Sequence, residues 1–244
     1  MKAAPEAQRR LLDLQAIDTA LTQLAHRRRT LPEIAEIAAV TRELSGLDDE
    51  RVRAQVAADD LDRDIARFEK DIDQVRSRRD RDKARLDSGG ALREIEGLQH
   101  ELATLERRQS ELEDAELELM EQKESADRAL DAVRKRIAEA EERRTDAERR
   151  RDQAYSEIDK DREFKSGARG PLAADLPADL VALYDKIRED TGLGAALLRS
   201  GRCGGCRIEL YGADLARVRA AAADEVVRCE ECRRIMVRTA ESGL

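Results

Sequence analysis

An apolar stripe with a repeat of about 3.5 residues runs through the segment from Leu92 to Phe164. No proline and no glycine interrupts this segment after Gly97. A repeat that is kept over so many turns needs a partner helix, and it imposes a left-handed supercoil on the pair. At 1.5 Å per residue the helix would be roughly 100 Å long. The stripe consists of Ile95, Leu98, Leu102, Leu105, Gln109, Leu112, Glu116, Leu119, Lys123, Ala126, Leu130, Val133, Ile137, Ala140, Arg144, Ala147, Arg151, Ala154 and Ile158.

The partner helix is expected upstream in the same chain. The same spacing recurs in an earlier segment, at Leu61, Ile65, Phe68, Ile72 and Val75. The sequence Asp87-Ser88-Gly89-Gly90 follows, and serine and paired glycines favour a turn. Folding about this turn places Ile72 near Leu105 and Phe68 near Gln109, so that the apolar stripes meet. The pattern predicts an antiparallel helical hairpin.

A further amphipathic helix is expected ahead of the hairpin, from about Pro5 to Arg29. Its apolar face carries Leu11, Leu14, Ile17, Leu21 and Leu24. The Leu31-Pro32 step should end or kink this helix, because proline removes an amide donor and crowds the preceding turn. A helix from Glu33 to Leu44 then leads through Gly46 into the hairpin.

The composition favours long helices over a compact globule. Charged residues form 41% of the 244-residue chain and aromatic residues only 2%, with no tryptophan and four prolines. A compact domain of this length would bury several large aromatic rings. Intrinsic disorder is the alternative for so charged a chain, but the long apolar periodicity favours a coiled coil.

The net charge of −8 argues against a general nucleic-acid coat protein, which would usually be basic. It does not exclude a local basic patch. No apolar stretch approaches the roughly 20 residues that are needed to cross a bilayer. Residues 1–8 lack the apolar core of a signal peptide. We therefore expect a cytoplasmic protein without a membrane partner, whose thiols stay reduced.

A change in composition at Ser166–Pro171 marks the expected linker between two domains. Residues 1–166 would form the coiled-coil hairpin, with its turn near residues 87–91. Residues 167–244 would form a smaller domain. In that domain the pattern predicts a short helix from Asp179 to Glu189 and a strand from Leu193 to Arg199.

All four cysteines fall in two Cys-x-x-Cys pairs, formed by Cys203 with Cys206 and by Cys229 with Cys232. The two-residue spacing lets both sulfurs of a tight turn point at one ion. Two such turns complete a tetrahedral set of thiolates, which suits Zn²⁺. Strands are expected after each pair, at residues 207–210 and 235–238. The predicted fold class is therefore mainly α, with a long antiparallel coiled-coil hairpin and a small C-terminal zinc ribbon of short strands plus helix.

Other uses of the same cysteines are less favoured. A reducing cytoplasm disfavours two structural disulfides, and a thioredoxin-like redox pair lacks the surrounding βαβ pattern. Iron in a rubredoxin-like site uses the same geometry as zinc, and the sequence separates the two metals poorly. Four protein ligands leave no position for an activated water, so we expect one structural Zn²⁺ whose removal unfolds the ribbon.

The order of these features resembles a family of bacterial coiled-coil proteins with a C-terminal C4-type zinc ribbon. The resemblance covers essentially the whole chain. It rests on the hairpin, the segment LREIEGLQHEL at residues 92–102, the Leu183-Tyr184 helix and the paired cysteine motifs. Family members commonly carry glycine after the last cysteine, where it permits a positive φ, whereas here Cys232 precedes Arg233. The resemblance implies no catalytic activity, and it implies binding to nucleic acid or to transcription-related proteins.

Arginines form three local basic sets against the acidic average. The first is at the hairpin tip and contains Arg76, Arg78, Arg79, Arg81, Lys83, Arg85 and Arg93. The second joins Arg27, Arg28 and Arg29 with Arg149, Arg150 and Arg151, which the hairpin should bring together. The third lies in the ribbon and includes Arg202, Arg207, Arg228, Arg233 and Arg234. Either these arginines pair with nearby carboxylates on solvated surfaces, or the second and third sets clamp a phosphate backbone.

The sequence thus favours a non-enzymatic zinc-ribbon adaptor that binds a transcription-related protein and can also touch nucleic acid. The alternative is an RNA- or DNA-binding protein that uses the ribbon and the second basic set to contact phosphates. His26 and His100 lie in long helices far from the cysteines and are not expected to bind metal. No nucleotide-binding glycine loop or Ser-His-Asp arrangement is evident. A monomer is expected, because polar stripe residues such as Lys123 and Arg144 weaken dimerisation.

Overall fold

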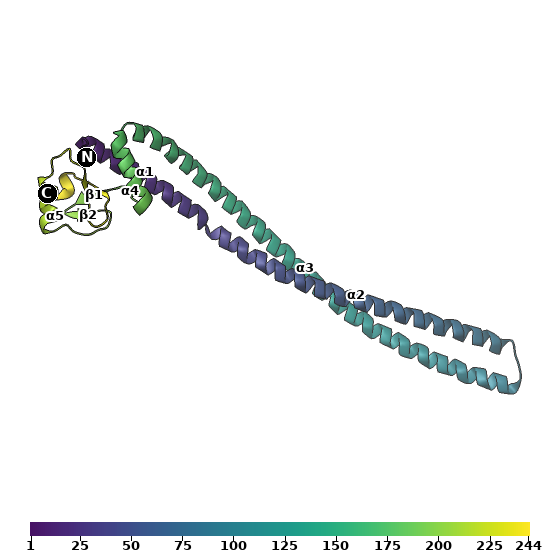
Figure 1. Ribbon diagram of the computed structural model, residues 1–244. Coiled ribbons are helices and arrows are strands. Elements are labelled where there is room, and N and C mark those ends of the chain that lie inside the picture. The colour runs from purple at the N-terminus through teal and green to yellow at the C-terminus, as the bar shows by residue number, and fades with distance from the viewer. The chain divides into compact units, whose positions relative to one another are not determined.

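The computed structural model describes every residue from Met1 to Leu244 and is dominated by helices (Figure 1). The chain divides into two compact units, and each is described by itself. Unit 1 contains residues 1–34 and 149–244, and unit 2 contains residues 35–148. The four longest helices are α1 (Pro5–Arg29), α2 (Pro32–Asp87), α3 (Leu92–Ala174) and α4 (Ala178–Thr191). None of the helices combines the length and the apolar character that crossing a membrane requires.

Unit 2 is an antiparallel helical pair from α2 and α3 (Figure 1). The connecting turn starts after Asp87 and ends before Leu92, as predicted, and Gly89 adopts a φ of 82° in it. Glycine reaches this left-handed conformation without a Cβ penalty. Every residue of the predicted α3 stripe is buried or half-buried. The 3.5-residue repeat therefore identified the inward face of the helix correctly.

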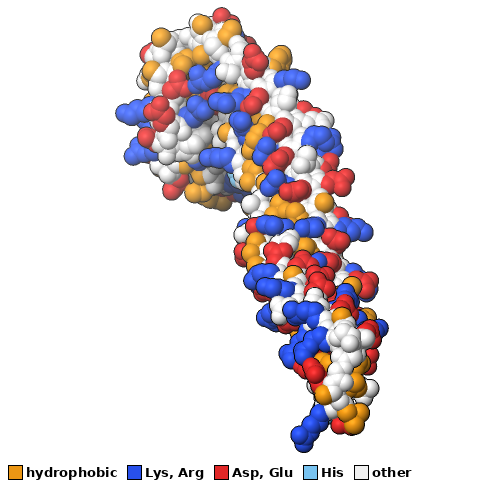
Figure 2. Space-filling model, turned by 90° about the vertical axis from the view of Figure 1, so that its right-hand side faces the viewer, with side chains coloured by type: hydrophobic (Ala, Val, Ile, Leu, Met, Phe, Trp, Pro, Cys, Tyr) orange, Lys and Arg blue, Asp and Glu red, His pale blue; other side chains and the backbone are white.

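Apolar packing and ion pairs hold the two arms of unit 2 together. Val40, Leu47 and Ala140 form a buried cluster. Figure 2 shows Lys and Arg side chains interspersed with Asp and Glu along the helices. Two pairs bridge the arms at 2.7 Å, Arg136 with Glu50 and Arg143 with Glu43. Both pairs are exposed to solvent and screened by it, so each contributes little, and the apolar seam supplies most of the stability.

Neighbouring arginines of α2 contact residues of α3 that lie far apart along that helix, because their side chains leave different faces of α2. Arg78 pairs with Glu101, close to what counting from the turn predicts. Its neighbour Arg79 donates a hydrogen bond to Oε1 of Gln109, at 2.9 Å. The count from the turn had placed Phe68 beside Gln109 and missed this contact. Such a count ignores both the face of the helix and the length of an arginine side chain.

Unit 1 packs α1, α4 and the end of α3 against a small sheet (Figure 1). The bounds of α1 agree with the predicted helix, and the chain leaves it just before Leu31-Pro32. Leu11 and Leu14 of α1 are fully buried in this core. They share it with residues of α4 and of the sheet, namely Leu180, Tyr184, Ile187, Ala195, Ile235 and Val237.

The linker expected at Ser166–Pro171 is wrong, because α3 continues through it to Ala174. The only proline inside α3 is Pro171, which lies in the last turn and removes one amide donor without ending the helix before Ala174. Tertiary contacts hold this end of the helix: Leu172 packs on the core and Arg169 forms ion pairs. Local composition predicted a linker, and packing overrode it.

The C-terminal part of unit 1 contains the strands β1 (Ala195–Arg199), β2 (Arg202–Cys203), β3 (Val227–Arg228) and β4 (Ile235–Val237). They form a four-stranded sheet with the order β2-β1-β4-β3. The two central strands are parallel, and both outer pairings are antiparallel. A strand predicted at residues 207–210 is wrong, because Arg207 turns the chain with a φ of 64° and only one bridge, Arg202 to Glu209, forms there. The remaining elements of this part are α5 (Gly212–Ala220) and the 3₁₀ turn η1 (Ala240–Ser242).

The N-terminus adds backbone pairing to the ribbon. The amide of Ala3 donates to the carbonyl of Asp224 at 2.7 Å, and the amide of Val226 donates to the carbonyl of Met1 at 3.1 Å. Lys2 also forms an ion pair with Asp224, at 3.0 Å. The first residues of the chain are therefore part of the C-terminal domain, which the sequence did not indicate.

Candidate metal centre

The four cysteine sulfurs meet at one point of unit 1. Sγ of Cys203 lies 3.8 Å from Sγ of Cys232, and Sγ of Cys206 lies 3.8 Å from Sγ of Cys229. All four sulfurs lie within 4.8 Å of one another. Sulfurs placed tetrahedrally at about 2.3 Å from one Zn²⁺ are separated by about 3.8 Å. The set fits this ion, and the four thiols are free rather than joined in disulfides.

Each cysteine pair forms the same tight turn. The amide of Arg207 donates to the carbonyl of Cys203 at 2.8 Å, and the amide of Arg233 donates to the carbonyl of Cys229 at 2.9 Å. Both arginines adopt the left-handed conformation, with φ values of 64° and 62°. The second turn thus keeps its shape without the glycine that the family resemblance implies at this position. An arginine takes the position instead.

The two glycines between Cys203 and Cys206 have separate packing reasons. A Cβ on Gly204 would lie 2.6 Å from the carbonyl oxygen of Leu197, whose backbone accepts the Gly204 amide. A Cβ on Gly205 would lie 2.6 Å from Cδ of Arg234. The sequence showed these residues only as spacing between ligands. In the structure, Gly204 of the first turn packs closely against the backbone of β1, and Gly205 packs against the side chain of Arg234.

Burial makes two of the four thiols harder to ionise in the absence of a metal. It raises the pKa of Cys229 to about 12 and also raises the pKa of Cys203. Burial acts in the same direction on Cys232, but hydrogen bonds from the Arg234 amide and from the other cysteines lower its pKa overall. A divalent cation would offset the cost of holding four buried thiolates together.

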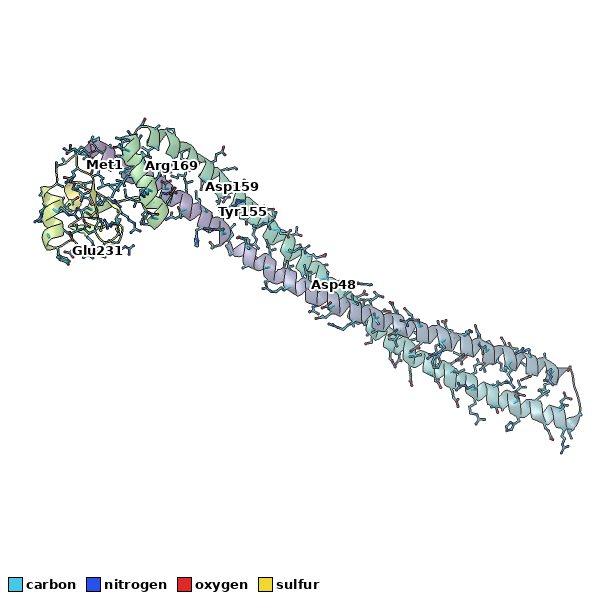
Figure 3. All side chains as sticks on the ribbon, in the orientation of Figure 1. Met1, Asp48, Tyr155, Asp159, Arg169 and Glu231 are labelled. Carbon is cyan, nitrogen blue, oxygen red and sulfur yellow. The ribbon has the colours of Figure 1, made fainter.

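Two arginines of the second basic set lie near the ring of Tyr155, a residue of α3 that is labelled in Figure 3. The Arg28 guanidinium lies 4.4 Å from the ring centroid of Tyr155, and that of Arg151 lies 5.9 Å from it. The expected meeting of residues 27–29 with residues 149–151 is thus confirmed in outline. Carboxylates accompany these arginines, however. Arg28 pairs with Asp159 at 3.5 Å, Arg150 with Glu33 at 3.8 Å and Arg151 with Asp152 at 2.7 Å. Arg149 also has an interaction partner. The side chains of Arg27 and Arg29 are exposed.

The ribbon arginines fall into two groups. Arg202 pairs with Glu209 at 2.9 Å, Arg228 donates to the carbonyl of Arg233 at 2.9 Å, and Arg234 donates to the carbonyl of Thr191 at 2.9 Å. These three side chains are engaged within the protein. Arg207 and Arg233 are exposed, and neither guanidinium forms an ion pair or a hydrogen bond. Of the five ribbon arginines predicted as contact residues, these two are therefore the unengaged ones.

A buried polar cluster on α1 was missed by the sequence analysis. Gln15 accepts hydrogen bonds from the amide of Gly194 at 2.7 Å and from Tyr184 at 3.3 Å. The Asp18 carboxylate, 1% exposed, pairs with Arg169 at 2.7 Å and Arg188 at 3.3 Å. Both polar residues fall on the apolar face that carries Leu11 and Leu14. Two polar residues on the apolar face of a helix were the sequence signal for a buried polar cluster.

These features define the class: a coiled-coil hairpin protein whose ribbon holds one structural Zn²⁺ through four cysteines. The chain belongs to the family of the CT398-like coiled coil hairpin domain, which matches residues 14–192. The C4-type zinc ribbon domain matches residues 202–236, which include all four ligands.

Relatives cover nearly the full chain. The protein Rv2229c of Mycobacterium tuberculosis is 42% identical, over 98% of both chains. A solved structure from Mycobacterium smegmatis is 38% identical with a TM-score of 0.88, and the match covers 98% of this chain and 100% of that one. CT398 from Chlamydia trachomatis shares the fold with a TM-score of 0.67 at 17% identity, over 96% of this chain and 98% of that one.

Proposed function

We propose that this chain is a non-enzymatic adaptor that binds a protein partner through a groove in its helical hairpin. The resemblance to bacterial zinc-ribbon coiled-coil proteins suggests a transcription-related partner. Four cysteines fill the coordination shell of the zinc, so no position is left for an activated water or a substrate. The metal then serves to hold the ribbon together rather than to catalyse a reaction.

The groove is the observation that carries this proposal. It lies between α2 and α3 in unit 2 and has a volume of about 880 Å³. Two half-buried stripe residues, Val75 and Leu105, lie along it. A third amphipathic helix laid into such a groove would cover apolar surface that a two-helix pair leaves partly exposed.

Charge around the groove favours an acidic partner helix. Lys70 and Arg81 line it from α2, both are exposed, and neither forms an ion pair. Two carboxylates also line the groove, Glu69 and Asp73, and Asp73 pairs with Arg76 at 3.5 Å, so the lining as a whole carries four basic and two acidic side chains. Carboxylates on a docked helix would find Lys70 and Arg81 free, and opposite charges at the rim of an interface favour association and select the partner.

A phosphate-clamp function draws less support from the contacts. Its second basic set is accompanied by carboxylates, which include Asp159, Asp152 and Glu33. Those carboxylates would repel a polyanion. Three of the five ribbon arginines predicted for this function are engaged within the protein, namely Arg202, Arg228 and Arg234.

The test compares two charge reversals in the full chain. Arg81→Glu changes the groove, and Arg93→Glu changes an exposed arginine outside the groove that also lacks an ion pair. Each tagged variant would be purified from its own cells after ribonuclease treatment, and bound proteins would be quantified by mass spectrometry. We expect Arg81→Glu to lose at least one protein that the wild type and Arg93→Glu retain. Identical protein profiles for all three chains would refute the groove as a partner site.

A further inference from the structure

One stretch of α3 in unit 2 carries carboxylates without any basic residue among them. Residues 109–122 contain six acidic side chains and no lysine or arginine. Three of these carboxylates, on Asp114, Glu118 and Glu121, are exposed and form no ion pair. Like charges three or four positions apart on a helix repel one another, as Asp114 and Glu118 do here. No ion pair inside the protein offsets this repulsion.

Two apolar side chains are exposed among these carboxylates. Leu117 is 59% exposed and Met120 is 53% exposed, and neither belongs to a core cluster. Side chains three or four positions apart on a helix are neighbours, so Leu117 lies between Asp114 on one side and Met120 and Glu121 on the other. The geometry of a single helix therefore places all of them on one surface. A lone exposed apolar residue is ordinary, whereas an adjacent pair within a charged border marks a contact surface.

The basic residues that follow this stretch are matched by other carboxylates. Lys123 pairs with Asp127 at 2.7 Å and with Asp62 at 3.2 Å. Arg128 pairs with Glu124. Their charges are already engaged, so the surface keeps an apolar centre and an unmatched negative border.

We propose that this surface docks a basic amphipathic helix of a partner protein. Apolar residues of the partner helix cover Leu117 and Met120, and its lysines and arginines pair with Asp114, Glu118 and Glu121. The surface extends over about two helical turns, which suits a partner whose apolar residues recur every three or four positions. Methionine favours such a contact, because its flexible thioether adapts to apolar partners of different shape.

The negative border selects the occupant. Phosphates of a nucleic acid, or the headgroups of an anionic lipid surface, would meet carboxylates around both apolar side chains. A second copy of the chain that presented the same surface would bring like charges together across a two-fold axis. None of these residues lines the groove between α2 and α3, and the free cations of the groove favour an acidic segment instead. The two surfaces of unit 2 therefore select partner segments of opposite charge.

A defined peptide tests the proposal on the zinc-loaded full chain. The probe is a synthetic helical peptide with leucines on one face and lysines on the other, and calorimetry measures its affinity. Leu117→Gln and Met120→Gln remove apolar contact but keep a good helix former, and each should weaken binding about tenfold. Glu121→Lys should weaken it about fivefold or more, because an attraction becomes a repulsion. The same peptide with glutamates in place of its lysines should not bind.

Matched controls separate this surface from the acidic character of the whole chain. Glu142→Lys makes the same change in net charge at an exposed position of α3, three heptads beyond Glu121. Val56→Gln removes an apolar side chain of α2 that is 51% exposed. Arg81→Ala changes the groove. All three variants should bind the lysine peptide as the wild type does.

Three results would overturn the proposal. Equal losses in Glu121→Lys and Glu142→Lys would mean that the peptide responds to net charge alone. Unchanged affinity in Leu117→Gln and Met120→Gln would remove the apolar centre from the contact. A dimer of the wild-type chain in sedimentation that Leu117→Gln dissolves would show that a second copy covers this surface.

Discussion

Tyr184 donates a hydrogen bond from its hydroxyl to the carboxylate of Asp18 at 2.9 Å, across a separation of 166 positions in the sequence. The bond joins α4 to α1. Arg169 at the end of α3 and Arg188 of α4 pair with the same carboxylate. Burial first, and then the bond to Asp18, raise the pKa of Tyr184 well above its usual value. Three helices of unit 1 thus converge on one buried charge.

Replacing this carboxylate should destabilise unit 1. We expect Asp18→Asn to lower the free energy of unfolding by about 3 kcal/mol, because it removes a buried charge that pairs with two half-buried guanidinium groups and leaves Arg188 without an ion pair and Arg169 with Asp185 alone. Denaturant-induced unfolding would measure the change. Asp13→Asn, at an exposed position of the same helix, should change stability by less than about 0.5 kcal/mol. Equal effects of the two substitutions would contradict the role assigned to Asp18.

The close approach of Gly204 to β1 predicts a specific failure of the first metal-binding turn. Gly204→Ala would place a methyl group 2.6 Å from the Leu197 carbonyl oxygen, so either the turn or β1 must shift. We expect zinc affinity to fall at least about tenfold, measured by competition with a chelator of known affinity. Gly167→Ala is the matched control, because an added Cβ there meets nothing within 4 Å. It should raise helix stability by up to about 1 kcal/mol and leave zinc affinity unchanged.

The hairpin and the ligand set could be predicted because they rest on periodicity and spacing. The α3 stripe named the inward residues, and the two Cys-x-x-Cys pairs named the ligands. Such patterns are written locally in the sequence. The turn after Asp87 also carried its own glycine signal.

Features that depend on tertiary contacts could not be predicted in this way. The segment 166–171 is helical because Arg169 and Leu172 are held by other parts of unit 1. The backbone pairing of Met1 and Ala3 with the ribbon joins opposite ends of the chain and leaves no local pattern. The strained conformation of Arg207 was likewise invisible, since a residue type that tolerates positive φ would have been needed to signal it.

Removal of zinc should unfold the ribbon and spare the helices. The ribbon core is small, and two of its six buried members, Cys203 and Cys229, are metal ligands. Without the ion, the remaining apolar burial is insufficient to hold β2, β3 and the two metal-binding turns, whereas β1 and β4 also pack on the helices of unit 1. We expect a strong chelator to abolish protection of the amides of β2, β3 and the turns in hydrogen exchange while the far-ultraviolet circular dichroism of the helices changes little. Full protection of β2 and β3 in chelated protein would exclude a structural role for the metal.

Zinc binding should release protons at neutral pH. Burial raises the pKa of Cys229 from 9.0 to about 12, so this thiol keeps its proton at pH 7 until zinc displaces it. In the metal-free fold the raised pKa adds stability below about pH 9, which is lost as the pH rises toward 12. The zinc-loaded fold has the opposite dependence and is weakened by acid, because protons compete for the thiolates. Calorimetry in buffers of different ionisation enthalpy would count the released protons, and no release at pH 7 would contradict coordination by thiols that keep their protons in the metal-free protein.

The hairpin near its turn contains a buried carboxylate that lowers its stability. Asp82 continues the inward face of α2, its side chain is only 10% exposed, and its Oδ2 has no hydrogen bond. Arg78 and Arg85 approach it no closer than 3.9 Å, so the charge is poorly compensated. A leucine would instead extend the apolar seam. We expect Asp82→Leu to stabilise the full chain by about 1–2 kcal/mol, since replacing a buried charge by an apolar side chain of similar size is often favourable.

The matched control is Asp80→Leu, at a side chain that is 62% exposed and pairs with Arg79 at 3.2 Å. That substitution gains no burial and should leave stability within about 0.5 kcal/mol of the wild type. Hydrogen exchange of amides on either side of the turn would locate the gain. If Asp82→Leu slowed exchange no more than Asp80→Leu, the buried carboxylate would not be the weak point of the hairpin. If Asp82→Leu instead unfolded the hairpin near its turn, Arg78 and Arg85 would stabilise the Asp82 carboxylate better than the 3.9 Å distances indicate.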